Sequence, residues 1–267
     1  MSELITRPFI SVGKLFFSAV DLFVGAFARA GTLYALMGRI GSRAPTIVKT
    51  MVFTKEQMMS LGVASLPLVL VTSCFTGGVA VSQAAYMFSN IVPMTYLGTA
   101  VCKATVMELA PVLTALVMAG RMGASIAAEL GSMKTNEQIE AMECLALDPI
   151  RYLIIPRVVA GMVMLLALTV FADLIAILGG WFVAVFFIDV SSFTFTNGLR
   201  LFFEPKDVFA GLLKSSVFGG IITLMGCYHG LTAEGGAEGV GKATMTAVVS
   251  SAVLILIFDF IVAALIF

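Results

Sequence analysis

The segment IPRVVAGMVMLLALTVFADLIAILGGWFVAVFF, residues 155–187, decides the fold class of this chain. Arg157 and Asp173 are its only charged residues, and almost all the others are apolar. About 20 apolar residues are enough for a helix to cross the hydrocarbon core of a bilayer. The segment therefore predicts a membrane-spanning helix that is longer than the bilayer requires and that tilts or projects from it.

The remainder of the chain has the same character. Of its 267 residues, 60% are hydrophobic and only 12% are charged, with a mean hydropathy of +1.05, whereas about 25% of residues are charged in an ordinary soluble domain. The composition predicts an all-α integral membrane protein with five spans, forming a single membrane domain over residues 1–267. The other four spans are predicted at residues 59–86, 97–120, 208–231 and 243–267.

Residues 8–29 predict a helix of another kind. At 100° per residue its large apolar side chains fall on one narrow stripe, and polar side chains fall opposite. Such a helix is expected to lie in the membrane interface rather than to cross the bilayer, although a helix packed on a soluble core is the alternative. The stripe consists of Phe9, Val12, Phe16, Val20, Phe23 and Phe27.

Basic residues orient the five spans. Seven of them precede the first span, none lies between the first two spans, and four fill or flank the second loop. Because positive residues stay in the cytoplasm, this predicts a cytoplasmic N-terminus and, after five spans, a periplasmic C-terminus. Arg200 and Lys206 in the third loop argue weakly against that orientation. The basic connector before the first span contains Arg39, Arg43, Lys49 and Lys55.

The stretch GGAEGVGKAT, residues 235–244, nearly matches a phosphate-binding loop. Ala243 stands where a Ser or Thr hydroxyl would reach magnesium, and no strand precedes the glycines. We therefore expect a glycine-rich turn between two spans and no ATP site. The single histidine, His229, and four scattered cysteines form no metal or nucleophile grouping. The chain is predicted to have no catalytic residues, metal or cofactor of its own.

The loop of residues 121–157 predicts a separate short helix at residues 135–147. Thr135 with Gln138 matches a capping box, and Asp148-Pro149 discourages continuation. One face is apolar and another is acidic, which suits docking to a partner, although a hairpin packed only on its own protein is also possible. The residues predicted to dock are Glu137, Ile139, Glu140, Met142, Glu143 and Leu145.

Three segments carry a resemblance to a known family: this loop, SLPLVLVTSCFTGGVAVSQ (residues 65–83) and GGAEGVGKATMTAVVSSAVLILIFDF (residues 235–260). The chain resembles the MlaE/YrbE family of permeases over about residues 55–267. Glu140-Ala141-Met142 also resembles the E-A-A motif of other ABC permeases, with Ala146 in place of the usual Gly. The resemblance implies a homodimeric permease. Because no transit peptide is visible, we expect the bacterial inner membrane, with a plastid membrane as the alternative. Two separate cytoplasmic ATPases would carry ATP and magnesium, and phospholipids or related lipids would move between the membrane and an MCE-domain ring.

Ionisable residues at bilayer depth are costly and often functional. Glu108 precedes Pro111, whose missing N–H frees the carbonyl of Met107 and predicts a bend. We predict that Glu108, Lys103 and Asp259 line a lipid pathway. Structural hydrogen bonds between spans are the alternative, favoured for Asp259 and Asp173. If the buried carboxylates instead couple ions to transport, the chain is a self-contained secondary carrier.

Overall fold

The computed structural model describes residues 31–43, 50–88, 92–201 and 204–266. The chain forms two compact units, Met1–Pro45 and Thr46–Phe267. Within the first unit, residues 31–43 are helical, so Arg39 and Arg43 of the predicted connector lie in a helix. The predicted interfacial helix, residues 8–29, lies outside the described residues.

The second unit contains five helical segments that are long and apolar enough to span a membrane, and no strand occurs among its described residues. This confirms the predicted all-α fold with five spans. Most of the spans extend beyond their predicted limits, because helical turns continue past the apolar windows. They run over Met51–Phe88, Met94–Thr135, Ile150–Phe186, Pro205–Leu231 and Gly236–Ile266.

The first two spans are built from several consecutive helical pieces. Span one consists of α2 (Met51–Gln57), η2 (Met58–Gly62), η3 (Val63–Ser65) and α3 (Leu66–Phe88). Span two consists of η4 (Met94–Tyr96), α4 (Leu97–Ala104), η5 (Thr105–Leu109), α5 (Ala110–Met118), η6 (Ala119–Gly123) and α6 (Ala124–Thr135).

The remaining elements are simpler. The short helix α7 (Gln138–Cys144) follows span two, and span three combines η7 (Ile150–Ile154) with α8 (Ile155–Phe186). The helix α9 (Ser192–Leu201) leads to span four, α10 (Pro205–Leu231), and span five is α11 (Gly236–Ile266).

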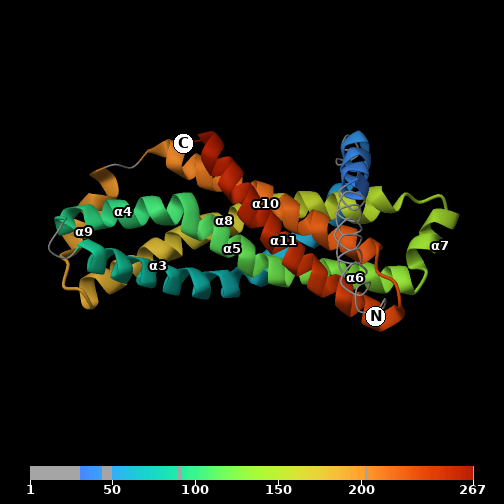
Figure 1. Cartoon of the computed structure of the whole chain (residues 1–267), viewed down its shortest axis with the longest axis horizontal. Helices are drawn as coiled ribbons and strands as arrows, with labels where there is room; N and C mark the ends of the chain where they lie inside the picture. Colours follow the sequence, from blue (N-terminus) through green and yellow to red (C-terminus); the bar gives the residue numbers. More distant parts are fainter. Residues whose placement is uncertain (1–30, 44–49, 89–91, 202–203, 267) are drawn as a thin grey trace, which may run out of the picture. The chain divides into compact units, whose positions relative to one another are not determined.

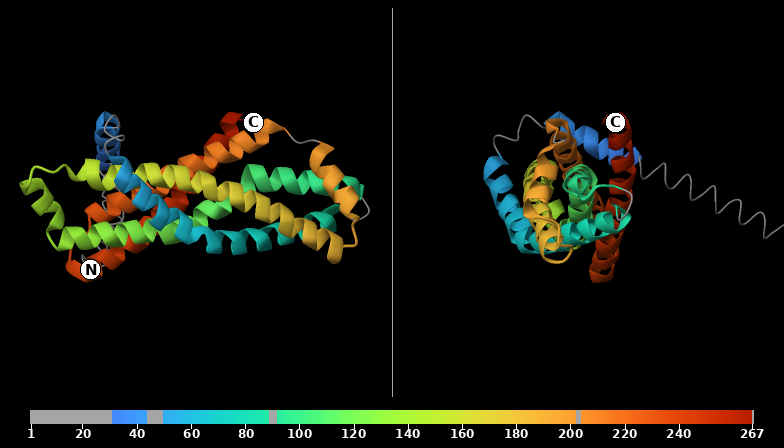
Figure 2. Two further views of the ribbon diagram at one scale, coloured as in Figure 1. Left: turned by 180° about the vertical axis from the view of Figure 1, so that it is seen from behind. Right: turned by 90° about the vertical axis from the view of Figure 1, so that its left-hand side faces the viewer.

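Within the second unit, α7 and α9 lie at opposite ends of the bundle (Figure 1). Helices α3, α4 and α8 extend to the α9 end, whereas α10 and α11 cross the middle of the bundle obliquely and reach the α7 end beside α6, as the view from behind also shows (Figure 2). α10 packs against α6, α8 and α11, and α3 packs along α8. α10 is therefore the central helix of the bundle.

Two glycines allow the spans to approach closely. A Cβ on Gly77 of α3 would lie 1.8 Å from the carbonyl oxygen of Ala176 in α8, and a Cβ on Gly219 of α10 would lie 2.3 Å from that of Gly161 in α8. Neither backbone could stay in place if a larger residue were introduced. Small residues thus bring both α3 and α10 into contact with α8, as is common between membrane helices.

The turn before the last span contains Gly235 and Gly236, whose φ angles are 92° and 67°. These left-handed conformations favour glycine, so the prediction of a glycine turn is confirmed for this pair. It is wrong for Gly239 and Gly241, which lie inside α11. The turn is shorter than the glycine spacing suggested.

Candidate functional site

A charged cluster joins spans two, four and five. Lys214 of α10 is completely buried, and its Nζ lies 2.5 Å from Oε1 of Glu108 and 2.9 Å from Oδ1 of Asp259. Glu108 belongs to η5 and Asp259 to α11. Two of the three predicted pathway residues, Glu108 and Asp259, are thus brought together by a lysine that was not among the candidates.

The local geometry of span two positions Glu108. The segment η5 is a π-helical turn, and Pro111 follows it in the first turn of α5. Proline cannot donate the backbone hydrogen bond that an α-helix would require there, and π-helical turns are frequent at functional sites. The irregularity predicted beside Pro111 is present as this wider turn.

The cluster is asymmetric in exposure and charge. The side chain of Lys214 is 0% exposed, whereas that of Glu108 is 42% and that of Asp259 is 22% exposed. With both carboxylates ionised, the group has one positive and two negative charges. The cation is therefore enclosed by protein, whereas both acidic groups are partly exposed.

Lys103 belongs to a second cluster. Its Nζ lies 3.2 Å from Oδ2 of Asp207 and 3.8 Å from Oε1 of Glu204. Asp207 precedes Lys214 by two helical turns, so both clusters lie along one face of α10. Lys103 and Glu108 do not pair with each other, because each pairs with a different part of α10.

Lys214 and Asp207 are the residues that sequence reasoning missed as site members. A lysine within an apolar span requires counter-charges, and Glu108 and Asp259 were carboxylates at comparable depth. The need of Lys214 for a counter-charge could therefore have pointed to this cluster from the sequence. Asp173, the remaining predicted intramembrane carboxylate, pairs with neither Lys103 nor Lys214 and belongs to neither cluster.

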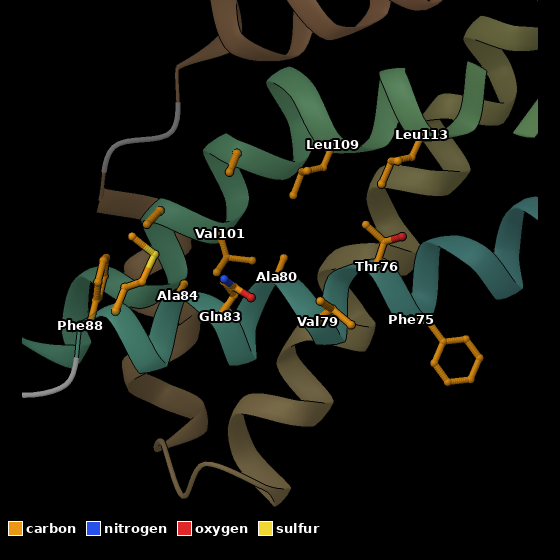
Figure 3. A pocket seen from close by; sticks show the side chains of 13 residues that line it. Phe75, Thr76, Val79, Ala80, Gln83, Ala84, Phe88, Val101, Leu109 and Leu113 are labelled. Carbon is orange, nitrogen blue, oxygen red and sulfur yellow. The ribbon is translucent and has the colours of Figure 1, made fainter. Parts of the chain in front are cut away.

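An apolar groove of about 650 Å³ lies between spans one and two. Leu109 and Leu113 extend from span two toward α3, and Gln83 contributes a polar group from α3 (Figure 3). Because Leu109 directly follows Glu108, one irregular turn carries a residue of the charged cluster and a residue of the groove. The volume is within the range of about 300–1,000 Å³ usual for small-molecule sites.

The predicted docking helix is present as α7, but its predicted limits are wrong. Thr135 belongs to α6 and its hydroxyl donates to the carbonyl oxygen of Ser132, so the capping box is not formed. Glu137 occupies the N-cap position with a φ of 59°. Asp148 accepts a hydrogen bond from the N–H of Ile150 and so begins the next helix rather than ending α7.

The C-terminal end of α7 is set by the backbone conformation of Ala146. Its φ is 58°, its N–H donates to the carbonyl of Glu143, and the N–H of Leu147 donates to that of Met142. These two bonds form a Schellman motif, in which glycine is usual at the left-handed position. The residue that departs from the E-A-A motif therefore occupies a position where glycine would be less strained.

The apolar face of α7 is divided between inside and outside. Ile139 is buried against its own chain, Met142 is half-buried, and Leu145 is 72% exposed. Because Ile139 packs against its own chain, only Met142 and Leu145 of the predicted apolar face remain available to a partner.

The acidic residues of α7 differ in their contacts. Glu137 and Glu143 are exposed, whereas Glu140 forms an ion pair with Lys134 at the end of α6. The hydrogen bond from Lys134 holds the pKa of Glu140 below its usual range. Glu140 is thus ionised at neutral pH and fastens α7 to α6.

The near match to a phosphate-binding loop has a different structure. Lys242 lies in α11 and pairs with Glu238 one turn earlier, at 2.7 Å, with both side chains exposed. No strand leads into this segment within the described residues. The lysine is part of an ordinary surface pair between residues four apart in a helix.

Comparisons with known proteins agree on a transport family. The sequence profile of the family described as Permease MlaE matches residues 54–265. A probable ABC transporter permease of Rickettsia prowazekii is 40% identical over 212 residues, 79% of this chain and 82% of the relative. One from Synechocystis is 41% identical over 246 residues, covering 91% and 90%.

A plant protein is also similar. The chloroplastic protein TRIGALACTOSYLDIACYLGLYCEROL 1 of Arabidopsis thaliana is 36% identical over 214 residues, which cover 80% of this chain and 61% of the plant protein. The matched region of the family profile contains the two charged clusters, the groove and α7. The similarity therefore extends over each of these site features.

Proposed function

Since this chain belongs to the MlaE permease family and is a permease subunit of an ABC transporter, we propose that it moves phospholipids or related lipids. The lipids pass between the bacterial inner membrane and a conduit of MCE-domain proteins. A separate cytoplasmic ATPase supplies the energy, and the working unit contains two copies of this chain. The α7 end faces the cytoplasm and the C-terminus faces the periplasm.

The observation that carries this proposal is the charged cluster of Glu108, Lys214 and Asp259 close to an apolar groove in the same span. A lipid needs an apolar surface for its tails and polar groups for its head. The π-helical turn places both kinds of surface within a few residues of each other. The lipid in the name of the Arabidopsis relative agrees with a lipid substrate.

The second part of the proposal is the role of α7. It projects at one end of the bundle (Figure 1), with Leu145 and two carboxylates exposed. A short helix with an exposed apolar residue and acidic neighbours can insert into a groove of a partner. We expect the ATPase to bind α7 and to transmit its movements through the loop.

One observation favours a second candidate, an ion-coupled carrier without an ATPase. A buried lysine between two carboxylates is the kind of group found in intramembrane ion pathways. A carrier of this kind would transport under an ion gradient alone. The two functions therefore differ in the energy source that they require.

The test is reconstitution of the purified complex in liposomes that contain labelled phospholipid and MCE-domain acceptor protein. We expect lipid transfer with ATP, and none with a non-hydrolysable analogue or with an ion gradient alone. Transfer driven by the gradient without an ATPase would establish the carrier. ATP hydrolysis without any lipid transfer would overturn the proposed substrate.

A further inference from the structure

Arg157 lies at the base of the loop that carries α7. Its side chain is only 4% exposed, one guanidinium nitrogen lies 2.6 Å from Oε1 of Glu129, and another donates to the carbonyl oxygen of Leu153 at 2.8 Å. Arginine suits this position, because its planar group binds two acceptors in fixed directions and remains charged when buried. One side chain thus joins the start of span three, where it also bonds one turn back, to Glu129 of span two.

These pieces belong to the two arms of the loop. Glu129 lies on α6, which continues span two, whereas Leu153 lies on η7 and Arg157 at the beginning of α8, in span three. The two charged residues are 28 positions apart, and α7 lies between them in the sequence. The ion pair therefore closes the loop at its base.

The central helix α10 supports the same region from one side. A Cβ on Gly230 of α10 would lie 2.8 Å from the Cβ of Leu130 in α6, and α10 also contacts α8 at Gly161. Both arms consequently rest on one helix, and the ion pair is a direct charged link from arm to arm. Beyond Glu129 toward the α9 end, span two contains the π-helical turn η6, where it departs from regular α-helix.

We infer that Arg157 and Glu129 are positioning residues that lock the two arms together, so that a displacement of α7 moves spans two and three as one body. This inference rests on the proposed function, in which a partner ATPase moves α7. Without the ion pair, α6 could bend at η6 while α8 stays in place. ATP would then be hydrolysed with less lipid moved.

The experiment uses the complete transporter with its ATPase, in liposomes. Arg157→Lys keeps the charge but loses the two-acceptor geometry, and Glu129→Gln keeps an acceptor but loses the charge. Exchange of the two residues, Glu129→Arg with Arg157→Glu, restores a pair of opposite charges. Glu238→Gln is the matched control, because it removes a carboxylate from an exposed pair within α11 that links no arms.

The measured quantity is the amount of lipid moved for each ATP hydrolysed, together with the ATPase content of each complex. We expect both single variants to retain the ATPase and to lower this ratio by roughly fivefold or more, a typical strength of coupling between linked sites. The exchange variant should recover part of it, and the control should equal wild type. The inference is overturned if the single variants move as much lipid per ATP as wild type. It is also overturned if they lose bound ATPase and lipid transport in equal proportion, so that the lipid moved per ATP stays constant.

A second readout needs no lipid substrate. Trp181 is the single tryptophan of this chain and lies near the α9 end of α8, where its Nε1–H donates to Ser192. With a tryptophan-free ATPase, nucleotide binding should change its fluorescence in wild type and much less in Arg157→Lys. If wild type moves no lipid, the proposed function fails, whereas an equal fluorescence change in wild type and variant overturns the lock.

Discussion

Lys214 and Lys134 both pair with glutamates, but in very different surroundings. Lys214 is enclosed among three spans with two carboxylates, whereas Lys134 is 37% exposed and pairs with Glu140 at the surface of the loop. A buried charge must have a counter-charge, while a solvent-exposed pair is screened and contributes little to stability. A lysine–glutamate ion pair is thus required for stability inside the bundle, whereas on the α7 loop it can be changed at little cost to the fold.

The largest effect is expected from Lys214→Met. This substitution leaves Glu108 and Asp259 without a cation. Removing one partner of a buried ion pair costs about 3–5 kcal/mol, and the partial exposure of both carboxylates sets the expected cost at the lower end of that range. We expect a large fall in the thermal unfolding midpoint of the purified complex in detergent. Lys103→Met is the control, because Lys103 is partly exposed and should tolerate the change better. Equal midpoints for both variants would contradict the contrast between buried and exposed charges.

Glu108→Gln is expected to affect transport more than stability. The amide oxygen can still accept a hydrogen bond from Lys214, and Asp259 still balances its charge. We expect about a tenfold loss of ATP-driven lipid transport, equivalent to about 1.4 kcal/mol, in a complex that assembles normally. Glu204→Gln changes a more exposed carboxylate nearby and should leave transport intact. Normal lipid flux in Glu108→Gln would remove this residue from the mechanism.

On the α7 loop, Met142→Asp and Glu140→Lys should act on the partner rather than on the fold. Met142→Asp places a charge on the half-buried face of α7, and Glu140→Lys sets two lysines against each other. Both should weaken ATPase association or reduce lipid transport per ATP, measured by subunit stoichiometry and transport assays.

A charge exchange separates the contribution of the Lys134–Glu140 ion pair from that of the acidic surface of α7. Lys134→Glu combined with Glu140→Lys restores the pair within the loop but not the acidic surface of α7. If the exchange recovers transport, the pair matters more than the surface. Full association and normal coupled transport in both single variants would show that α7 is not the transmission element.

The smallest expected effect is a gain in stability. Ala146→Gly should relieve the left-handed strain at the end of α7 and stabilise it by about 1 kcal/mol. Ala141→Gly is the matched control within α7, because its exposed helical position should be destabilised by about the same amount. Hydrogen exchange of the α7 amides measures both. Slower exchange in Ala141→Gly than in Ala146→Gly would contradict this assignment.

Much of the architecture was predictable because it depends on local composition. A run such as residues 155–187 has to be a span, since its apolar surface is stable only in hydrocarbon. The five spans, the turn at Gly235 and Gly236 and the helix between spans two and three follow from such local rules. The exact ends of α7 did not follow, because the left-handed Ala146 replaced the stop expected at Pro149.

What the sequence by itself determined was that each intramembrane charge needs a partner. Only the tertiary structure decided which partner, because Glu108 and Lys214 are 106 residues apart and meet where η5 packs against α10. The same holds for Glu129 and Arg157, which meet at the base of the loop. Hydrophobic length is a property of one segment, whereas the pairing of buried charges depends on how several segments pack together.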